Sequence, residues 1–372
     1  MRVLYFSRDY TPHDHRFLSA MAERNIQAYH LRLERRGHKQ EDRMLPTGVT
    51  PVKWEGGRGE YDHYNHRELV NSLRRVIRQV RPDLIHAGPV QTAAWLAAQS
   101  RFRPLVTMSW GSDLLVDAES SSLMSRLTKF SLNKTDVLVG DCQAVRDKAV
   151  SFGFPDDRIV TFPWGVDLKT FAPGDKQNDY RWRAGWEEEF VVLHLRSWEQ
   201  FYGVDVFARA FVKAARQRPE LRLFLLGNGS LAPQIRQILM PVQDRVQFAG
   251  QVSQEKLPEY YQASDLYVSA SHSDGSSVSL MEALASGLPS LVSGIPGNRE
   301  WLENSEAGWL FPDGDVDALA AKLVETSENR QKLVEVGKAA RKLAEARADW
   351  SKNFEVLLEG YDLALTKGVR NG

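Results

Sequence analysis

The chain has 372 residues, of which 42% are hydrophobic, and this length exceeds the size at which a single core usually stops growing. We therefore expect two domains. Lys and Arg (48) balance Asp and Glu (48), which argues against a general attraction to nucleic acid or to an anionic membrane. Cys142 is the single cysteine, so no intrachain disulfide can form. The sequence shows no signal-peptide pattern and no apolar run of about 18 residues, so we expect no transmembrane segment. Together with the single cysteine, this predicts a cytoplasmic protein.

The first half alternates short apolar runs with segments of helical periodicity. Apolar residues recur at three- and four-residue steps in one such segment and form a single stripe, namely Leu69, Leu73, Val76, Ile77 and Val80. The apolar runs at 3–6, 84–87, 104–109 and 136–140 read as strands. This alternation is typical of a parallel sheet covered by helices.

The same alternation restarts after residue 190 and predicts a second doubly wound sheet. Residues 163–179 separate the two series, because they are rich in Pro, Gly and Asp and keep no regular period. We expect an N-terminal domain at 1–168 and a C-terminal domain at 169–351. Residues 316–366 read as consecutive helices, and we expect the last helix, about 352–372, to cross back onto the first domain.

Residues 271–302 carry the most informative chemical pattern. Asp274 lies in a Gly- and Ser-rich turn after a predicted strand, and Glu282 lies about one turn inside the following predicted helix. The backbone N–H groups of Ser277, Val278 and Ser279 would open that helix and offer a metal-free site for a diphosphate. Glu282 would then take ribose hydroxyls, and Asp274 the hydroxyls of a sugar.

This segment resembles the signature of the large retaining glycosyltransferase family with the GT-B fold (family four, glycosyl transferases group 1). Two acids with seven residues between them are followed by an Ala-rich helix and a Gly-Leu-Pro strand. Further stretches are similar to that family, at 83–88, 109–115, 136–145, 162–175, 194–211, 223–231 and 246–271. The resemblance implies an α/β fold of two Rossmann-like doubly wound parallel-sheet domains that face a central cleft, with the donor site in the second.

The resemblance also assigns roles to individual residues. It implies that Arg196 contacts the diphosphate, that Gly229 lets the backbone approach it, and that Phe248 lines the base. On the acceptor side, we expect contacts from His15, Trp110 and Asp113.

Three departures from the family pattern surround the expected reacting centre. The family usually places a Lys shortly after the Arg, whereas this chain has Tyr202, which offers a neutral and weaker donor. Trp110 stands where the family often carries His, and residues 9–18 replace its usual Gly-rich loop. These differences leave the acceptor and the details of catalysis open.

Other interpretations of individual motifs are less favourable. Residues 227–232, GNGSLA, match a dinucleotide fingerprint if Ala232 replaces its third Gly. The following strand, however, ends in Gly-Gln rather than in the acid that a dehydrogenase needs, so a dehydrogenase is not favoured.

Possible metal sites and sugar-stacking residues also have simpler interpretations. Asp315 is expected to cap a helix rather than to bind metal with Asp313. His13 and His15 are expected in a polar loop rather than a metal cluster. Trp54, Trp110 and Trp198 could stack against a sugar, but large aromatic side chains are more often core or interface residues, so the core is favoured while Trp110 stays an acceptor-side candidate.

Together these observations predict a retaining, metal-independent hexosyltransferase with no cofactor. Its donor would be a nucleoside-diphosphate sugar, with UDP favoured and GDP next, and its acceptor a carbohydrate, a lipid-linked molecule or a small molecule, with peripheral membrane contact possible and no nucleic-acid partner. Arg196, Asp274 and Glu282 would form the catalytic set. The missing Lys and His leave one alternative from another class, a catalytically silent nucleotide-sugar-binding GT-B protein.

Overall fold

The computed structural model describes residues 1–34, 41–58, 65–175 and 179–370. The chain folds into two compact units. Unit 1 comprises Met1–Phe162 and Phe354–Gly372, and unit 2 comprises Pro163–Asn353. The chain therefore enters unit 2 at Pro163 and returns to unit 1 within its last helix.

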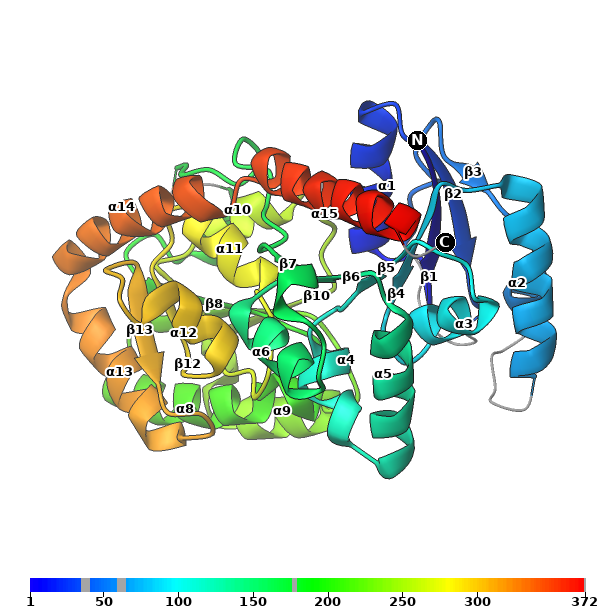
Figure 1. Cartoon of the computed structure of the whole chain (residues 1–372). Coiled ribbons are helices and arrows are strands. Elements are labelled where there is room, and N and C mark those ends of the chain that lie inside the picture. The colour runs from blue at the N-terminus through cyan, green and yellow to red at the C-terminus, as the bar shows by residue number, and fades with distance from the viewer. Residues whose placement is uncertain (35–40, 59–64, 176–178, 371–372) are drawn as a thin grey trace. The chain divides into compact units, whose positions relative to one another are not determined.

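Unit 1 is built on a parallel seven-stranded sheet with the order β3-β2-β1-β4-β5-β6-β7 (Figure 1). The strands are β1 Arg2–Ser7, β2 Gln27–Arg32, β3 Thr50–Pro51, β4 Leu84–Gly88, β5 Leu105–Met108, β6 Val137–Gly140 and β7 Ile159–Thr161. The helices are α1 Pro12–Glu23, α2 His66–Val80, α3 Ala93–Ser100, α4 Ser112–Leu115, α5 Ser122–Lys134, α6 Gln143–Ser151 and α15 Trp350–Arg370. The strand order reverses between β1 and β4, which places a topological switch point there.

The expected apolar stripe forms the buried face of α2. Leu69, Leu73, Val76 and Val80 are buried, and their core cluster includes side chains of β1, β4 and α3. Asn71, Arg75, Arg78 and Gln79 are exposed on the other face, as the 3.6-residue period of a helix requires. The helix predicted from this stripe is therefore confirmed.

Unit 2 contains a parallel six-stranded sheet with the order β10-β9-β8-β11-β12-β13 (Figure 1). The strands are β8 Phe190–Leu195, β9 Leu221–Leu226, β10 Val246–Gly250, β11 Leu266–Ser269, β12 Ser290–Ser293 and β13 Gly308–Phe311. The helices are α7 Asp179–Ala184, α8 Val204–Gln217, α9 Ala232–Leu239, α10 Leu257–Gln262, α11 Val278–Ala285, α12 Pro296–Leu302, α13 Val316–Glu328 and α14 Arg330–Arg347. Here the order reverses between β8 and β11, so this pair marks the second switch point. The predicted fold class, two doubly wound parallel-sheet domains, is confirmed.

A buried ion pair holds the amino-terminal ends of β8 and β11 together. Nη1 of Arg181 lies 3.1 Å from Oδ2 of Asp265, and both side chains are almost fully buried. Asp265 also accepts the N–H of Val191 in β8, and Arg181 donates to the carbonyl of Ala263 before β11. Because these hydrogen bonds satisfy both charges, the pair fixes α7 against the start of the sheet.

No helix within the described ranges is both long and apolar enough to span a bilayer.

Tyr361 ties the end of the chain to the unit 1 sheet. Its hydroxyl lies 2.6 Å from Nδ1 of His86 in β4, and the rings of Tyr5 and Phe17 also lie beside this imidazole. Nε2 of His86 is buried and, within the described residues, has no hydrogen-bond partner. Burial lowers the pKa of His86 to about 3, so the ring is neutral in the folded protein at neutral pH.

This pKa shift predicts how stability depends on pH. In the unfolded chain His86 takes up a proton below about pH 6.5, whereas the folded protein excludes that proton, so acidification favours unfolding. At pH 5.5 this one residue costs about 1.4 kcal/mol of unfolding free energy relative to pH 7.5. We expect His86→Asn to unfold with a shallower pH dependence than wild type in denaturant titrations at the two pH values.

Tyr361→Phe is the matched control, because it removes the hydroxyl and leaves the imidazole. It should lower stability at both pH values by a similar amount. His13, His30 and His194 also have pKa values lowered by burial, so the variant should flatten the slope without abolishing it. An unchanged slope in His86→Asn would contradict this account.

Candidate active site

Arg196 follows β8 directly at the switch point of unit 2. Its backbone is held by Gly227, which has φ +102°, a conformation that side chains rarely adopt. A Cβ on Gly227 would lie 2.2 Å from the carbonyl oxygen of Arg196, so only glycine permits this approach. The Gly-rich turn after β9 therefore positions the strand end that carries the arginine.

The Arg196 guanidinium joins two segments that follow β11. Its Nη2 lies 2.6 Å from Oδ2 of Asp274, and its Nη1 donates to the hydroxyls of Ser277 (3.0 Å) and Ser279 (3.1 Å). The Arg196 and Asp274 side chains are 12% and 23% exposed, so solvent still reaches this pair. The structure thus brings together four of the predicted site residues, Arg196, Asp274, Ser277 and Ser279.

Burial and neighbouring groups act in opposite directions on Arg196. Burial, the largest single effect, lowers the pKa of its guanidinium, but the charge and hydrogen bond of Asp274 together with the nearby phenols of Tyr267 and Tyr202 raise the pKa above its ordinary value. The arginine is therefore a permanent cation. Its guanidinium carbon lies 4.3 Å from the centre of the Tyr202 ring, an attractive cation–π arrangement.

Helix α11 begins beside this cation with its first N–H groups uncapped. Ser277 is the N-cap residue, but its side chain makes no capping hydrogen bond and accepts instead from Arg196. In the described part of the chain, the N–H groups of Val278 and Ser279 have no acceptor. The partial positive charge of a helix start and the guanidinium therefore lie together, which favours a bound anion.

Glu282 lies on the same helix and takes other partners. Its side chain is buried and accepts hydrogen bonds from Nε2 of Gln254 and from the hydroxyl of Tyr261, both at 2.8 Å. Burial, and then the charge of Glu282, raise the pKa of Tyr261 well above its usual value, so this phenol keeps its proton and donates. Sequence reasoning missed Gln254 and Tyr261, since neither shares a local motif with Glu282.

The Gly-rich turn after β9 is fixed by Glu199. The Glu199 carboxylate accepts the backbone N–H of Ser230 at 2.8 Å and the Ser230 hydroxyl, and these bonds lower its pKa. A Cβ on Gly229 would lie 2.5 Å from the carbonyl oxygen of Trp198, so the chain's own packing already requires glycine there. Any contact between Gly229 and a ligand stays a prediction.

Phe248 in β10 belongs to a separate aromatic cluster. The Arg236 guanidinium lies 4.6 Å from its ring centre, and the Trp198 ring packs against it edge-on at 6.2 Å. Trp198 is 2% exposed and Trp54 is 4% exposed, which confirms that both are core residues, whereas Trp110, which was also expected in the core, is only half-buried. The predicted base contact of Phe248 remains a prediction.

In unit 1, the expected acceptor-side residues follow the carboxyl ends of β1 and β5. The Trp110 ring lies 5.7 Å from the ring of His13 and 6.1 Å from that of Phe17. His15 instead lies beside Tyr10, and burial lowers its pKa. The structure therefore pairs Trp110 with His13, a residue that the sequence did not single out for this role.

Asp113 is turned into the fold of unit 1. Oδ1 accepts the Ser109 hydroxyl (2.6 Å) and the N–H groups of Trp110 and Leu114, and Oδ2 accepts the N–H of Val90. The side chain is 2% exposed. Asp113 therefore orders the loop that presents Trp110, and direct contact with an acceptor stays a prediction.

The acidic motifs weighed as metal sites have other partners. Asp315 accepts the N–H groups of Asp317 and Ala318 and thereby caps α13, as predicted, while Asp313 pairs with His272 at 2.7 Å. Thr11 caps α1, and Asp14 completes a capping box with it by accepting the Thr11 backbone N–H. Across the described ranges, no group of three or more His, Cys, Asp or Glu side chains is arranged to hold a metal ion.

Two family models match this chain. Residues 13–170 match the model described as Glycosyltransferase Family 4, and residues 176–343 match the model described as Glycosyl transferases group 1. Together they extend over both units.

Individual relatives are distant in sequence. The chain is 24% identical over 281 residues to N-acetyl-alpha-D-glucosaminyl L-malate synthase from Bacillus anthracis, covering 73% of this chain and 72% of that protein. It is 27% identical over 220 residues to the amylovoran biosynthesis glycosyltransferase AmsK from Erwinia amylovora, covering 57% of this chain and 52% of that protein. For AmsK, the match therefore spans about half of the relative.

Solved structures share the whole fold. HepE from Anabaena, crystallised in complex with UDP, superposes with a TM-score of 0.80 at 19% identity over 97% of this chain and all of that chain. WaaG, described as a glycosyltransferase involved in lipopolysaccharide biosynthesis, superposes with a TM-score of 0.73 at 15% identity over 95% of this chain and 98% of its own.

The buried contact of Glu282 generates a stability prediction. Tyr261→Phe would leave the Glu282 carboxylate without one of its donors inside the core, so we expect the free energy of unfolding to fall by about 1–3 kcal/mol. Denaturant titration monitored by circular dichroism measures this loss. Tyr29→Phe is the control, because within the described structure the half-buried Tyr29 hydroxyl has no hydrogen-bond partner, and it should change stability by less than about 0.5 kcal/mol. Equal effects of the two substitutions would refute the role given to Tyr261.

Proposed function

Because the chain belongs to the family of GT-B-fold glycosyltransferases described by these two models, glycosyltransferase family 4 and group 1, we propose that it transfers a sugar from a nucleoside-diphosphate donor to an acceptor hydroxyl. One observation carries this proposal. The Arg196 cation lies at the uncapped start of α11, hydrogen-bonded to the Ser277 and Ser279 hydroxyls. A diphosphate is the ligand that this combination of charge and N–H groups suits best.

The proposed donor site uses the charges already present. Arg196 and the N–H groups of Val278 and Ser279 hold the diphosphate, and Glu282 holds the ribose. Asp274 neutralises Arg196 in the absence of a ligand, so an arriving diphosphate must share the cation with this carboxylate. Asp274 is then free to accept hydrogen bonds from the hydroxyls of the donor sugar.

UDP is the proposed nucleotide, with GDP next. The support comes from HepE, whose structures are described as complexes with UDP, with UDP and glucose, and with UDP-glucose. The proposed sugar is a hexose. The acceptor is a carbohydrate, a lipid-linked molecule or a small molecule, and unit 1 would bind it through the Trp110 loop and His15.

The proposed reaction retains the configuration of the donor's anomeric carbon. Glu282 is assigned to the ribose, so Asp274 and Glu282 do not form the nucleophile and acid pair of a double displacement. We therefore favour a front-face displacement. The bond from the anomeric carbon to the diphosphate oxygen breaks, the acceptor oxygen bonds to that carbon on the same face, and the acceptor proton passes to the departing phosphate. Arg196 and the α11 N–H groups stabilise the charge that develops on the diphosphate, without a metal.

The nucleotide is tested by ligand-induced stabilisation. At saturation, the correct nucleoside diphosphate raises the melting temperature through mass action, and we expect UDP to raise it more than GDP, ADP or TDP does. The matching sugar donor should then release its diphosphate at least slowly, and NMR should show a product with the donor's anomeric configuration. Stabilisation by UDP with no release from any donor would instead favour the silent nucleotide-sugar binder, and an inverted product would exclude the front-face route.

Arg196 is tested by substitution. Arg196→Ala removes the cation beside the leaving group, so we expect turnover to fall by about 100-fold or more. Arg209→Ala is the control: Arg209 forms an ion pair with Asp205 in unit 2, on α8, and this variant should keep turnover near wild type. Turnover of Arg196→Ala within about threefold of wild type would remove Arg196 from the proposed role.

A further inference from the structure

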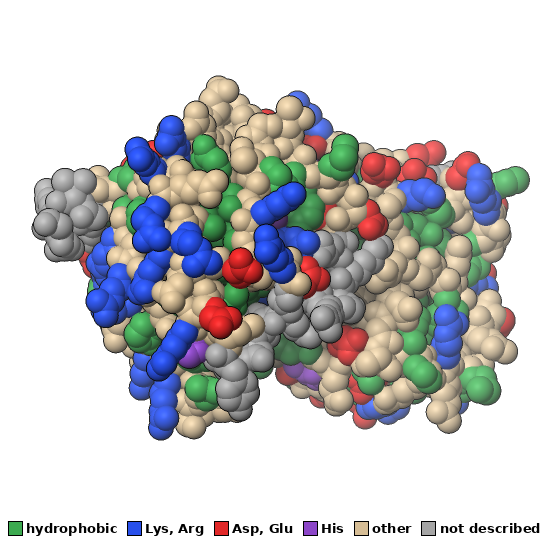
Figure 2. Space-filling view, turned by 90° about the vertical axis from the view of Figure 1, so that its right-hand side faces the viewer, with side chains coloured by type: hydrophobic (Ala, Val, Ile, Leu, Met, Phe, Trp, Pro, Cys, Tyr) green, Lys and Arg blue, Asp and Glu red, His purple; other side chains and the backbone are tan. Residues whose placement is uncertain are grey.

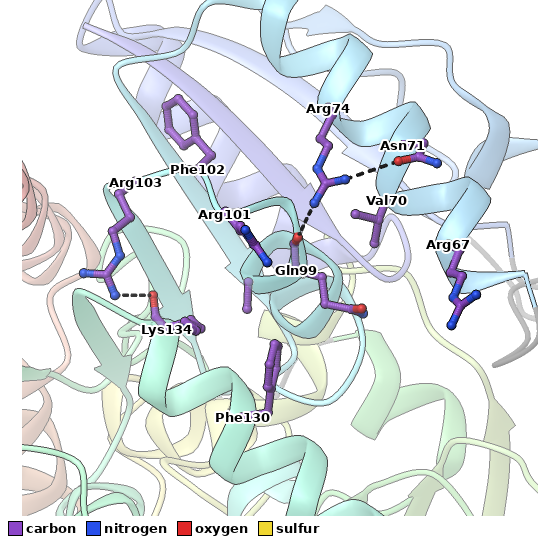
Figure 3. A pocket seen from close by; sticks show the side chains of 11 residues that line it. Arg67, Val70, Asn71, Arg74, Gln99, Arg101, Phe102, Arg103, Phe130 and Lys134 are labelled. Atoms are coloured by element: carbon purple, nitrogen blue, oxygen red, sulfur yellow. Dashed lines mark hydrogen bonds between the residues drawn. The ribbon is translucent and has the colours of Figure 1, made fainter. Parts of the chain in front are cut away.

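A cationic pocket lies on unit 1, away from every residue assigned above. It has a volume of about 770 Å³ and lies among α2, α3, α5 and the segment that precedes β5 (Figure 3). Five of its lining side chains are basic, namely Arg67, Arg74, Arg101, Arg103 and Lys134. None of its lining residues is acidic.

Most of this positive charge is not balanced within the described residues. Arg103 pairs with Asp136 at 2.7 Å, but the other four cations have no acidic partner there. The chain as a whole carries equal numbers of acidic and basic residues, so this excess is local. Figure 2 shows Lys and Arg side chains gathered toward the left of the view, with few acidic side chains among them. Cations that line one pocket repel one another, and an anion between them relieves that repulsion.

Two features make the pocket a built site rather than a loose surface. The Arg74 guanidinium is fixed by the carbonyl oxygens of Gln99 (3.0 Å) and Ser100 (3.4 Å) at the end of α3. Nε2 of Gln99 is buried and, among the described residues, has no acceptor. A buried donor without a partner is unfavourable, and a rotation of the half-buried Gln99 side chain that brings Nε2 to a ligand oxygen in the pocket would relieve this cost.

The pocket opens at the opposite end of the sheet from the Trp110 loop. Arg103 precedes β5 and Lys134 precedes β6, so both lie at the amino ends of their strands, whereas Trp110 follows the carboxyl end of β5. All strands of this sheet run in the same direction. The pocket is therefore distinct from the proposed acceptor-side residues.

The lining chemistry indicates the ligand. Guanidinium groups present planar pairs of donors that match phosphate oxygens, and four of the five cations are arginines. The volume is that of a small-molecule site, and Phe102 and Phe130 add apolar surface to its wall. We infer that this pocket is a second anion site of the protein, which binds a small phosphorylated molecule with at least two negative charges.

Inorganic pyrophosphate is the probe, measured by isothermal titration calorimetry at low salt. The measurement uses the full chain carrying Arg196→Ala, so that the proposed donor site contributes least. We expect a dissociation constant of about 1 mM or tighter that weakens as salt is added. Adding Arg67→Ala and Lys134→Ala should weaken binding about tenfold or more, because two unpaired cations are lost.

The control adds Arg78→Ala and Lys129→Ala instead. These exposed cations lie on the same two helices, α2 and α5, but outside the pocket, so this variant should bind like its parent. Arg101→Gly gives a second test without backbone strain, because Arg101 has φ +65°, a conformation that glycine adopts freely. It should weaken pyrophosphate binding and leave the melting temperature unchanged or raised.

Three results would overturn the inference. They are the absence of pyrophosphate binding, equal affinity in the pocket and control variants, and binding to phosphatidylglycerol vesicles without binding to pyrophosphate. The last would assign the basic residues to a membrane surface rather than to a small ligand. Because the probe is not a donor and Arg196 is already removed, these outcomes are independent of whether the proposed transferase activity is found.

Discussion

The reversal of strand order between β8 and β11 is the constraint on which the candidate site depends. The two strands are parallel neighbours, so the segments that follow their carboxyl ends lie at the same edge of the sheet. Arg196 and Asp274 are 78 positions apart in the chain, yet their side chains lie 2.6 Å apart because each comes shortly after one of these strands. The buried Arg181–Asp265 pair holds the amino-terminal ends of these two strands together, and Gly227 lets the turn after β9 lie against the Arg196 carbonyl.

The contacts of Arg196 also explain why the first N–H groups of α11 are uncapped. A serine N-cap normally satisfies an N–H group of its own helix, but the Ser277 hydroxyl accepts from Arg196 instead. The helix thereby loses a contribution of about 1 kcal/mol and keeps free donors beside a permanent cation. Asp274 limits the cost of that arrangement, since its carboxylate neutralises the guanidinium until an anion arrives. The local loss of capping and the proposed binding of a diphosphate therefore follow from the same geometry.

The sequence predicted the architecture because the apolar periods of its strands and helices are local. The α2 stripe and the Asp315 cap were foreseen in this way. Spacing and family resemblance predicted that Arg196, Asp274, Ser277 and Ser279 belong to one site, and in the structure the last three all contact Arg196. The partners of these residues were not foreseen, because Glu282 meets Gln254 and Tyr261, and Glu199 meets Ser230, through contacts that no local pattern encodes. The pairing of Trp110 with His13 was missed for the same reason.

The cationic pocket shows that the net charge of a chain does not predict the charge of a single pocket. A net charge of zero argues against a long-range field, and that argument holds for the whole surface. It does not limit a single hollow, because screening at physiological salt confines each charge to a range of about 8 Å. Arg67, Arg101 and Lys134 come from three separate segments and meet only when α2, α3 and α5 pack on one sheet. A fold can therefore gather cations from separate segments in one place although the net charge of the chain is zero, and both proposed anion sites, at Arg196 and in the unit 1 pocket, depend on this.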